Sequence, residues 1–203
     1  MNKIKAGWAE ADITPEDKVE ICGQYYQRLP RRIHLRLGGS VLVLESDKSE
    51  QAVMISVDLT ILPAVIKAWD SKSYSCFANS FDFAAVGHCR RAVYTNGISE
   101  MYGDTSRDDF IGMEGNEDST VEILFTFSED KKPTGAVVNV ACPSQVMEAT
   151  YFISSDFMGE VRMLLKGKFG QDFCTLCQIS SAGDQSPRDL ARIRDGVNKM
   201  YTV

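Results

Sequence analysis

Strand-like and helix-like segments alternate along the second half of this 203-residue chain, and this alternation most constrains its fold. The segments TVEILFTFS (120–128) and TGAVVNVA (134–141) are rich in β-branched and aromatic residues, which favour strands. The segment SSDFMGEVRMLLKGKFG (154–170) has the apolar spacing of a helix, and DFCTLCQIS (172–180) returns to a strand pattern. This order predicts an α/β fold with mixed β-sheet layers flanked by helices.

The predicted helix at 154–170 has recognisable ends. Ser154 or Ser155 is a suitable N-cap, and Gly170 is a typical stop. The helical spacing predicts that one set of apolar side chains forms the buried face: Phe157, Val161, Leu164, Leu165 and Phe169.

The first half of the chain has its own strand and helix signals. A strand is predicted from Lys5 to Ile13, and the runs 40–46 and 51–59 form a predicted hairpin around the polar turn DKSE. ILPAVIKAWDSK (61–72) carries a short helical pattern, and FDFAAVG (81–87) is a further strand candidate.

Two predictions concern the remaining segments. Residues 95–119 are acidic and without period, so they predict one long loop, which is uncommon in a compact domain and often functional. The last helix is predicted from Ser186 to Tyr201.

Composition bounds the class of protein. With 203 residues, 44% hydrophobic and 25% charged, the whole chain 1–203 is expected to form a single soluble domain. A net charge of -6 and a pI near 5.0 argue against binding nucleic acid. The sequence contains no apolar run long enough to predict a membrane span. Because it also contains no apolar signal segment, we expect a cytoplasmic location. Whether the chain forms a homo-oligomer is left open.

The cysteines and histidines of this chain do not indicate a disulfide framework or a histidine-rich metal site. The six cysteines are expected to be free thiols, and the two histidines cannot make a three-histidine metal site. Cys174 and Cys177 have redox spacing but lie within a predicted strand, so their thiols point to opposite faces. A thiol-redox function is therefore not favoured.

Ser186 stands between a glycine-containing turn and the predicted last helix, in SSAGDQSPRD (180–189). With Asp189 and Pro187 it fits a helix cap, which is a complete structural account. The same position places a hydroxyl beside free backbone N–H groups, which favour an oxyanion. Local sequence leaves both interpretations open.

The segment GHCRRAVY (87–94) brings together three basic or titratable side chains. In an extended segment His88 and Arg90 share one face and Arg91 points away. Arginine suits carboxylates, phosphates or an oxyanion, and histidine can act as acid, base or ligand. The alternative is a surface basic cluster paired with the acidic loop.

Two further candidates have simpler explanations. Cys142 ends a predicted strand without an electropositive neighbour in sequence, which favours a buried small residue over a nucleophile. The acidic side chains of 95–119 lack the spacing of a calcium loop, which favours a solvated loop.

Several separated segments together resemble one family, the N-terminal catalytic domain of the neutral/alkaline non-lysosomal ceramidases, and more closely its uncharacterised bacterial relatives. KAGWAEADITPED is similar to the family's first strand and its G-x-x-x-x-D-I-T-P signature, here Gly7 to Pro15. The predicted hairpin resembles the one that ends in an aspartate, here Asp58. SSAGDQSPRD resembles the family segment N-x-G-D-x-S-P-N.

The resemblance implies roles for particular residues. It aligns Ser186 with the amide-cleaving nucleophile, and Arg90 with an arginine that contacts the substrate. TGAVVNVACPSQVM resembles the strand that ordinarily carries a zinc-binding histidine. The resemblance thus implies a truncated ceramidase-like α/β domain with a zinc cofactor.

The zinc ligands that the family would use are missing from this sequence. A T-H-T-H segment expected between Ile66 and Lys67 is absent, as is the histidine near Cys142, and the family domain continues beyond the position of Val203. Segments of a longer protein could be lacking, the mechanism could be metal-free or different, or the protein could be a binding-only relative. The pattern at Ile66–Lys67, typical of two joined helix fragments, favours the first explanation.

The sequence therefore supports two hypotheses. In the first, the protein is a hydrolase of an amide or related bond in a small-molecule substrate, with Ser186 as nucleophile and Asp184 shaping the site. Arg90, Arg91 and His88 would contact the substrate. In the second, it is a non-catalytic module in which Arg90, Arg91 and the long loop bind a small anionic or polar ligand.

Overall fold

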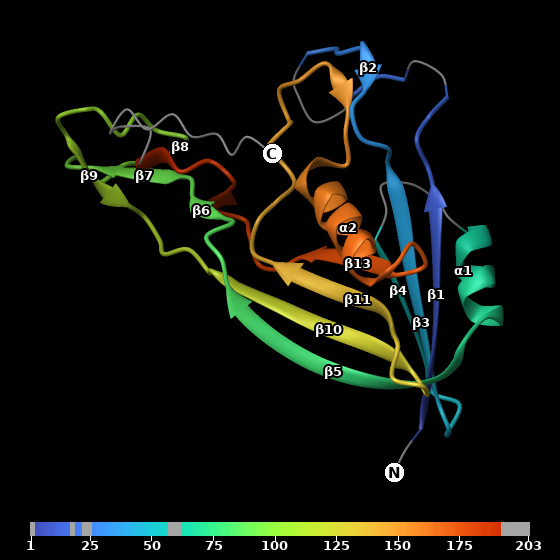
Figure 1. The fold of residues 1–203 in the computed structure, drawn as a ribbon. Coiled ribbons are helices and arrows are strands. Elements are labelled where there is room, and N and C mark those ends of the chain that lie inside the picture. Colours follow the sequence, from blue (N-terminus) through green and yellow to red (C-terminus); the bar gives the residue numbers. More distant parts are fainter. Residues whose placement is uncertain (1–2, 17–18, 22–25, 57–61, 192–203) are drawn as a thin grey trace. The chain divides into compact units, whose positions relative to one another are not determined.

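The structure, a computed structural model, describes residues 3–16, 19–21, 26–56 and 62–191 (Figure 1). The chain divides into two compact units, each assembled from separate stretches of sequence. Unit 1 comprises Met1–Ser80, Ile123–Val138 and Met147–Gln178, and unit 2 comprises Phe81–Glu122, Asn139–Val146 and Ile179–Val203. That residues 1–203 form a single domain stays a prediction.

A large mixed-order sheet is the main feature of the described residues (Figure 1). Its strands follow the order β13-β11-β10-β5-β1-β3-β4. Their bounds are Ile4–Asp12 for β1, Gly38–Ser46 for β3, Gln51–Ser56 for β4, Ser73–Phe83 for β5, Thr120–Ser128 for β10, Pro133–Val140 for β11 and Cys174–Ile179 for β13. β1 pairs antiparallel with β3 and β5, and β3 and β4 form the predicted hairpin.

β3 shows why this sheet carries a core on both faces. Val41 and Val43 pack with Ala64 and Ala68 on one face, while Leu42 packs with Ala6, Val137 and Leu176 on the other. Because neighbouring residues of a strand point to opposite faces, the unbroken apolar run in SVLVLES can fill two layers.

Helix α1 (Leu62–Asp70) packs against β1 at a glycine. A Cβ atom built at Gly7 would lie 1.9 Å from the backbone oxygen of Ala68. The close approach of helix and strand therefore requires the glycine that begins the ADITP-containing signature. α1 also runs without interruption through Ile66 and Lys67, where the sequence predicted a junction of two helix fragments.

Helix α2 (Asp156–Phe169) confirms the predicted helix, but its predicted buried face is only half-buried apart from the exposed Leu164. Its buried residues are Asp156, Met158 and Gly159, whereas Leu164 is 73% exposed. The carboxylate of Asp156 accepts a hydrogen bond from the Met147 N–H at 2.8 Å. This bond holds the first turn of the helix against the segment around Met147. Ser154 Oγ accepts the Asp156 N–H at 3.0 Å, and Gly170 ends the helix as expected.

Several short strands lie outside the large sheet. In unit 1, β2 (Arg32–Ile33) and β12 (Phe152–Ile153) pair in parallel. In unit 2, β7 (Arg91–Tyr94) lies between β8 (Ser99–Met101) and β9 (Phe110–Met113), and β6 (His88–Cys89) pairs with β14 (Gln185–Ser186). The described fold thus confirms the predicted class, an α/β fold with mixed β-sheet layers, and its helices are few.

Three sequence predictions are wrong in their bounds. Residues 95–119 are not one loop, since they contain β8 and β9. The strand predicted at 81–87 is the end of β5, whose serine-rich start at Ser73 lacks an apolar pattern. Ser186 belongs to β14, and the first helical residues after it are Leu190 and Ala191.

Some predictions fall outside the described residues. They are the end of the strand 51–59, including Asp58, the thiol of Cys22, and the last helix beyond Ala191. None of the described helices is long and apolar enough to cross a bilayer.

Candidate functional site

Two of the predicted site residues, Ser186 and His88, meet in the small β6–β14 ladder of unit 2. Ser186 lies directly opposite His88 in this antiparallel pair, and Gln185 lies opposite Cys89. Directly opposed side chains lie on one face of a ladder with their Cβ atoms about 4.5–5.5 Å apart. The fold therefore brings Ser186 and His88 together from distant parts of the sequence.

Ser186 is 1% exposed and is held by a local turn. Its Oγ accepts the backbone N–H of Arg188 at 3.2 Å. Because Ser186 ends a strand, this bond stabilises the turn that leaves β14 rather than the first turn of a helix. Having used an acceptor site, the hydroxyl keeps its own proton for donation.

His88 is 7% exposed, and its two ring nitrogens have different surroundings. Nδ1 lies 2.7 Å from Oε2 of Glu117, while Nε2 is buried and has no hydrogen-bond partner among the described residues. Glu117 reaches this site from the acidic segment before β10. Pairing of the basic cluster at 87–94 with the acidic segment was one interpretation of the sequence, and the contacts of His88 with Glu117 and of Arg91 with Glu114 agree with it. Which acidic residue meets His88 was not predictable, because the register of Glu117 relative to His88 is not local.

Arg90 ties β6 to the turn that precedes β14. Its backbone N–H donates to the Asp184 carbonyl at 2.8 Å, and Nη2 donates to the Gly183 carbonyl at 2.8 Å. Nη1 donates to the Tyr102 hydroxyl at 3.3 Å, while Nε is buried without a partner in the described part of the chain. One side-chain bond of Arg90 thus supports the turn and another reaches Tyr102, while the buried Nε–H is left to donate to another group.

Arg91 and Asp184 belong to a separate charged group. Arg91 in β7 donates to the carboxylate of Glu114, which raises the pKa of Arg91 and lowers that of Glu114. The negative charge of Asp184 also raises the pKa of Arg91 and the pKa of Glu114, but by less than the ion pair changes them. The Asp184 carboxylate is therefore close to this ion pair. Asp184 Oδ1 also accepts a hydrogen bond from Gln185 Nε2 at 3.0 Å.

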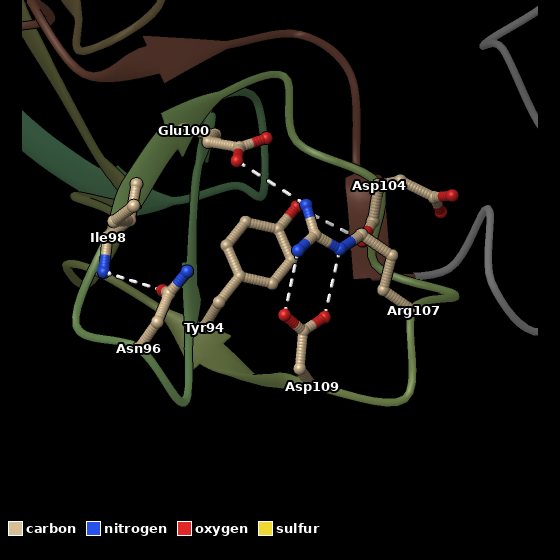
Figure 2. A network of polar contacts seen from close by, with 7 residues as sticks. All are labelled: Tyr94, Asn96, Ile98, Glu100, Asp104, Arg107 and Asp109. Carbon is tan, nitrogen blue, oxygen red and sulfur yellow. Dashed lines mark hydrogen bonds and ion pairs between the residues drawn. The ribbon is translucent and has the colours of Figure 1, made fainter.

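A polar network supports the three-stranded sheet beside these residues (Figure 2). Tyr94 is fully buried, and its hydroxyl donates to the Asp104 carbonyl at 3.1 Å. The Arg107 guanidinium lies 3.9 Å from the centre of the Tyr94 ring and forms two hydrogen bonds to Asp109, which lower the pKa of that carboxyl (Figure 2). The acidic segment is therefore partly ordered by its own charges rather than simply solvated.

The three thiols that the sequence singled out, those of Cys142, Cys174 and Cys177, are poor candidates for a nucleophile. Cys142 is fully buried, and its Sγ lies 3.6 Å from the Pro143 carbonyl oxygen. Burial raises the pKa of Cys174 to about 12 and also raises the pKa of Cys177. A raised pKa disfavours the reactive thiolate, in agreement with the sequence argument against a redox function.

The residues present do not fit a zinc site. Within the described ranges no group of three or more His, Cys, Asp or Glu side chains is arranged to hold a metal. The position where the resemblance implies a histidine is occupied by the buried thiol of Cys142. A zinc-dependent step is therefore not part of the chemistry that these residues support.

The fold is similar to that of the neutral ceramidases. The crystal structure of neutral ceramidase from Pseudomonas aeruginosa aligns with 92% of this chain and 40% of its own, with a TM-score of 0.72 and 14% sequence identity. A structure of ceramidase complexed with C2 aligns with 92% and 39%, with a TM-score of 0.69 and 14% identity.

These likenesses concern the fold. No protein-family model and no curated protein matches the sequence. The chain spans about two fifths of the length of the solved ceramidases that it resembles.

Proposed function

We propose that the protein is a ceramidase-like hydrolase that cleaves an amide or a related bond. Two findings support the proposal together. The fold is similar to neutral ceramidase over 92% of this chain. Ser186, which the sequence resemblance aligns with the nucleophile, lies opposite a histidine at the end of a short strand. This opposition of Ser186 and His88 is the observation that carries the proposal.

Each site residue receives a role from its contacts. The Ser186 hydroxyl attacks the carbonyl carbon of the substrate, and Asp184 with the N–H groups of its turn shapes the site. Arg90 binds a polar group of the substrate, because its Nε is buried and lacks a partner among the described residues. Arg91 is already paired with Glu114, so we assign it to supporting the loop rather than contacting the substrate.

Hydrolysis of fluorogenic N-acyl amides of increasing acyl length tests the proposal. We expect the wild-type protein to hydrolyse at least one of them, and Ser186→Ala to reduce kcat by at least about a thousandfold. Ser128→Ala, at the end of β10, is the matched control and should retain activity. Circular dichroism should verify that Ser186→Ala is folded, since losing the bond to Arg188 costs about 1 kcal/mol. Unchanged activity in Ser186→Ala would contradict the proposal.

A second candidate function is a non-catalytic binding module. The 1% exposure of Ser186 favours it, because an attacking hydroxyl has to be reached by the substrate. In that case Arg90→Ala abolishes binding of a small carboxylate in calorimetry, Ser186→Ala leaves it unchanged, and no amide is cleaved.

A further inference from the structure

We propose that His88 is the general base for Ser186 and that Glu117 is the residue that positions His88. This inference rests on the proposed hydrolase function and names how its nucleophile is activated without a metal. Its three residues come from β14, β6 and the acidic segment before β10, all within unit 2.

The hydrogen bond to Glu117 determines which nitrogen of His88 can act. A carboxylate accepts hydrogen bonds, so the contact of 2.7 Å assigns a proton to Nδ1. In the neutral ring Nε2 then carries the lone pair and is the basic atom. The carboxylate also favours the positive charge that the ring gains when Nε2 takes a proton.

The burial of Nε2 separates this arrangement from an ordinary surface ion pair. The His88 side chain is 9% exposed, compared with 41% for Glu117, so the paired nitrogen faces the more open side. Nε2 is buried without a partner in the described part of the chain, which leaves a polar atom unsatisfied. A buried polar atom of this kind calls for a hydrogen-bond donor, either a neighbouring hydroxyl or a water.

Ser186 is the donor that the ladder presents to this nitrogen. It lies directly opposite His88, on the same face, and its Oγ already accepts a hydrogen bond from Arg188. No hydrogen bond joins Ser186 Oγ to Nε2 across the described ladder, so the hydroxyl has to rotate about χ1 among its staggered positions. Such contacts often tighten only when substrate is bound.

The chemistry balances with these groups and water. Nε2 takes the hydroxyl proton of Ser186 while Oγ bonds to the carbonyl carbon, and the electron pair of the C=O bond moves to oxygen. As the C–N bond breaks, His88 returns the proton to the leaving nitrogen, which yields an acyl-serine and an amine. His88 then takes a proton from water, the hydroxide attacks the acyl-serine, and the proton returns to Oγ as the carboxylic acid leaves.

Covalent labelling of Ser186 by a fluorophosphonate tests the base without requiring the natural substrate. The probe reacts with a hydroxyl only when a neighbouring base activates it, and mass spectrometry locates the adduct. We expect His88→Gln to slow labelling by about a hundredfold to ten-thousandfold. Glu117→Gln should slow it by a smaller factor, because it weakens only the positioning of the ring.

Matched controls and a chemical rescue distinguish catalysis from structure. His34→Gln changes the chain's other histidine, which lies in unit 1, and Glu129→Gln changes an exposed carboxylate of the β10–β11 turn. Both should label at the wild-type rate. In His88→Ala, added imidazole should restore part of the rate, which a merely structural histidine would not allow. Thermal unfolding checks that each variant is folded.

The outcomes separate this inference from the proposed function. Labelling and amide hydrolysis by wild type, with His88→Gln equally fast, would overturn the base and leave the hydrolase standing. A wild-type Ser186 that neither labels nor cleaves would overturn both. A water that satisfies Nε2 for structural reasons only predicts unchanged labelling in His88→Gln, and therefore also counts against the base.

Discussion

Asp12, in the ADITP signature, ends β1 by joining it to the segment before β3. Its Oδ1 accepts the Thr14 N–H at 2.9 Å, and its Oδ2 accepts a hydrogen bond from Arg36 at 2.5 Å. Thr14 Oγ1 in turn accepts the N–H of Leu37 at 2.8 Å. Of the two signatures that suggested a family, ADITP is thus a structural anchor in unit 1, whereas GDQSP carries the candidate chemistry in unit 2.

This anchor makes a prediction about stability at low pH. Hydrogen bonds from Thr14, followed by Arg36, lower the pKa of Asp12 from 3.8 to about 2. A carboxyl whose pKa is lower in the folded state stabilises the fold above its unfolded pKa and loses that effect as the pH falls through the folded one. The side chain is 47% exposed, so solvent screening limits the contribution to roughly 1 kcal/mol.

Urea unfolding of Asp12→Asn measures that contribution. At pH 7 the variant should be less stable than wild type by roughly 1 kcal/mol, and the difference should shrink as the pH falls from about 4 towards 2. Asp130→Asn, in the exposed turn after β10, should show no such difference at either pH. A gap for Asp12→Asn that stays constant down to pH 2 would contradict the assignment.

At the scale of elements, close approaches and short pairings position the segments. α1 reaches β1 only because Gly7 has no side chain, and α2 buries Asp156, Met158 and Gly159 most completely while the ring of Phe169 packs against Phe125. The β6–β14 ladder has only two residues in each strand, yet it sets the register of the candidate site. A single glycine and a two-residue ladder therefore decide which faces of the helices and strands pack together.

Two glycine substitutions test the importance of close packing, because they are expected to change the free energy of unfolding in opposite directions. Gly7→Ala should destabilise the protein by about 1–3 kcal/mol, because the backbone oxygen of Ala68 has to move. Gly167→Ala, inside α2 with nothing within 4 Å of an added Cβ, should stabilise it by up to about 1 kcal/mol. Denaturant unfolding measures both. A neutral Gly7→Ala would show that α1 moves freely over β1.

At the scale of the whole molecule, the similarity of the fold does not extend, in the described part of the chain, to the zinc site that the sequence resemblance implied. The fold is similar to neutral ceramidase, but the described residues do not assemble the metal site that the sequence resemblance implied. His88 is paired with Glu117, and the His34 ring lies 5.2 Å from the Phe152 ring. The Glu117 contact occupies only Nδ1 of His88, and among the described residues no group of three or more His, Cys, Asp or Glu side chains is arranged to hold a metal.

Zinc binding by the whole chain tests this difference. Zinc sites need about four ligands, mostly histidine, cysteine and carboxylate, in a tetrahedral arrangement. After dialysis against zinc and then buffer, atomic absorption should find far less than one zinc per chain. Ser186 labelling should also be unchanged by a chelator. Stoichiometric zinc that survives dialysis would show that ligands assemble in a way that these residues do not indicate.

Much of the fold was predictable because its signals are local. Runs rich in β-branched residues predicted β3, β10 and β11, strands were also predicted at β1 and β13, and periodicity with a terminal glycine predicted α2. β8 and β9 were missed because strands of three or four residues carry no measurable period, and their stability comes from the Tyr94 and Arg107 network. The most buried residues of α2, Asp156, Met158 and Gly159, were missed because their burial depends on the segments around the first turn and not on apolar periodicity.

For the candidate site, too, some features follow from the local sequence and others only from the tertiary structure. The sequence by itself determined that Ser186 follows a strand and a turn, and that His88 and Arg90 share a face, because these follow from neighbouring residues and strand geometry. Only the tertiary structure decided that Ser186 lies opposite His88 and that Glu117 pairs with Nδ1. Pairing between distant segments depends on strand register and close packing, which no short stretch of sequence specifies.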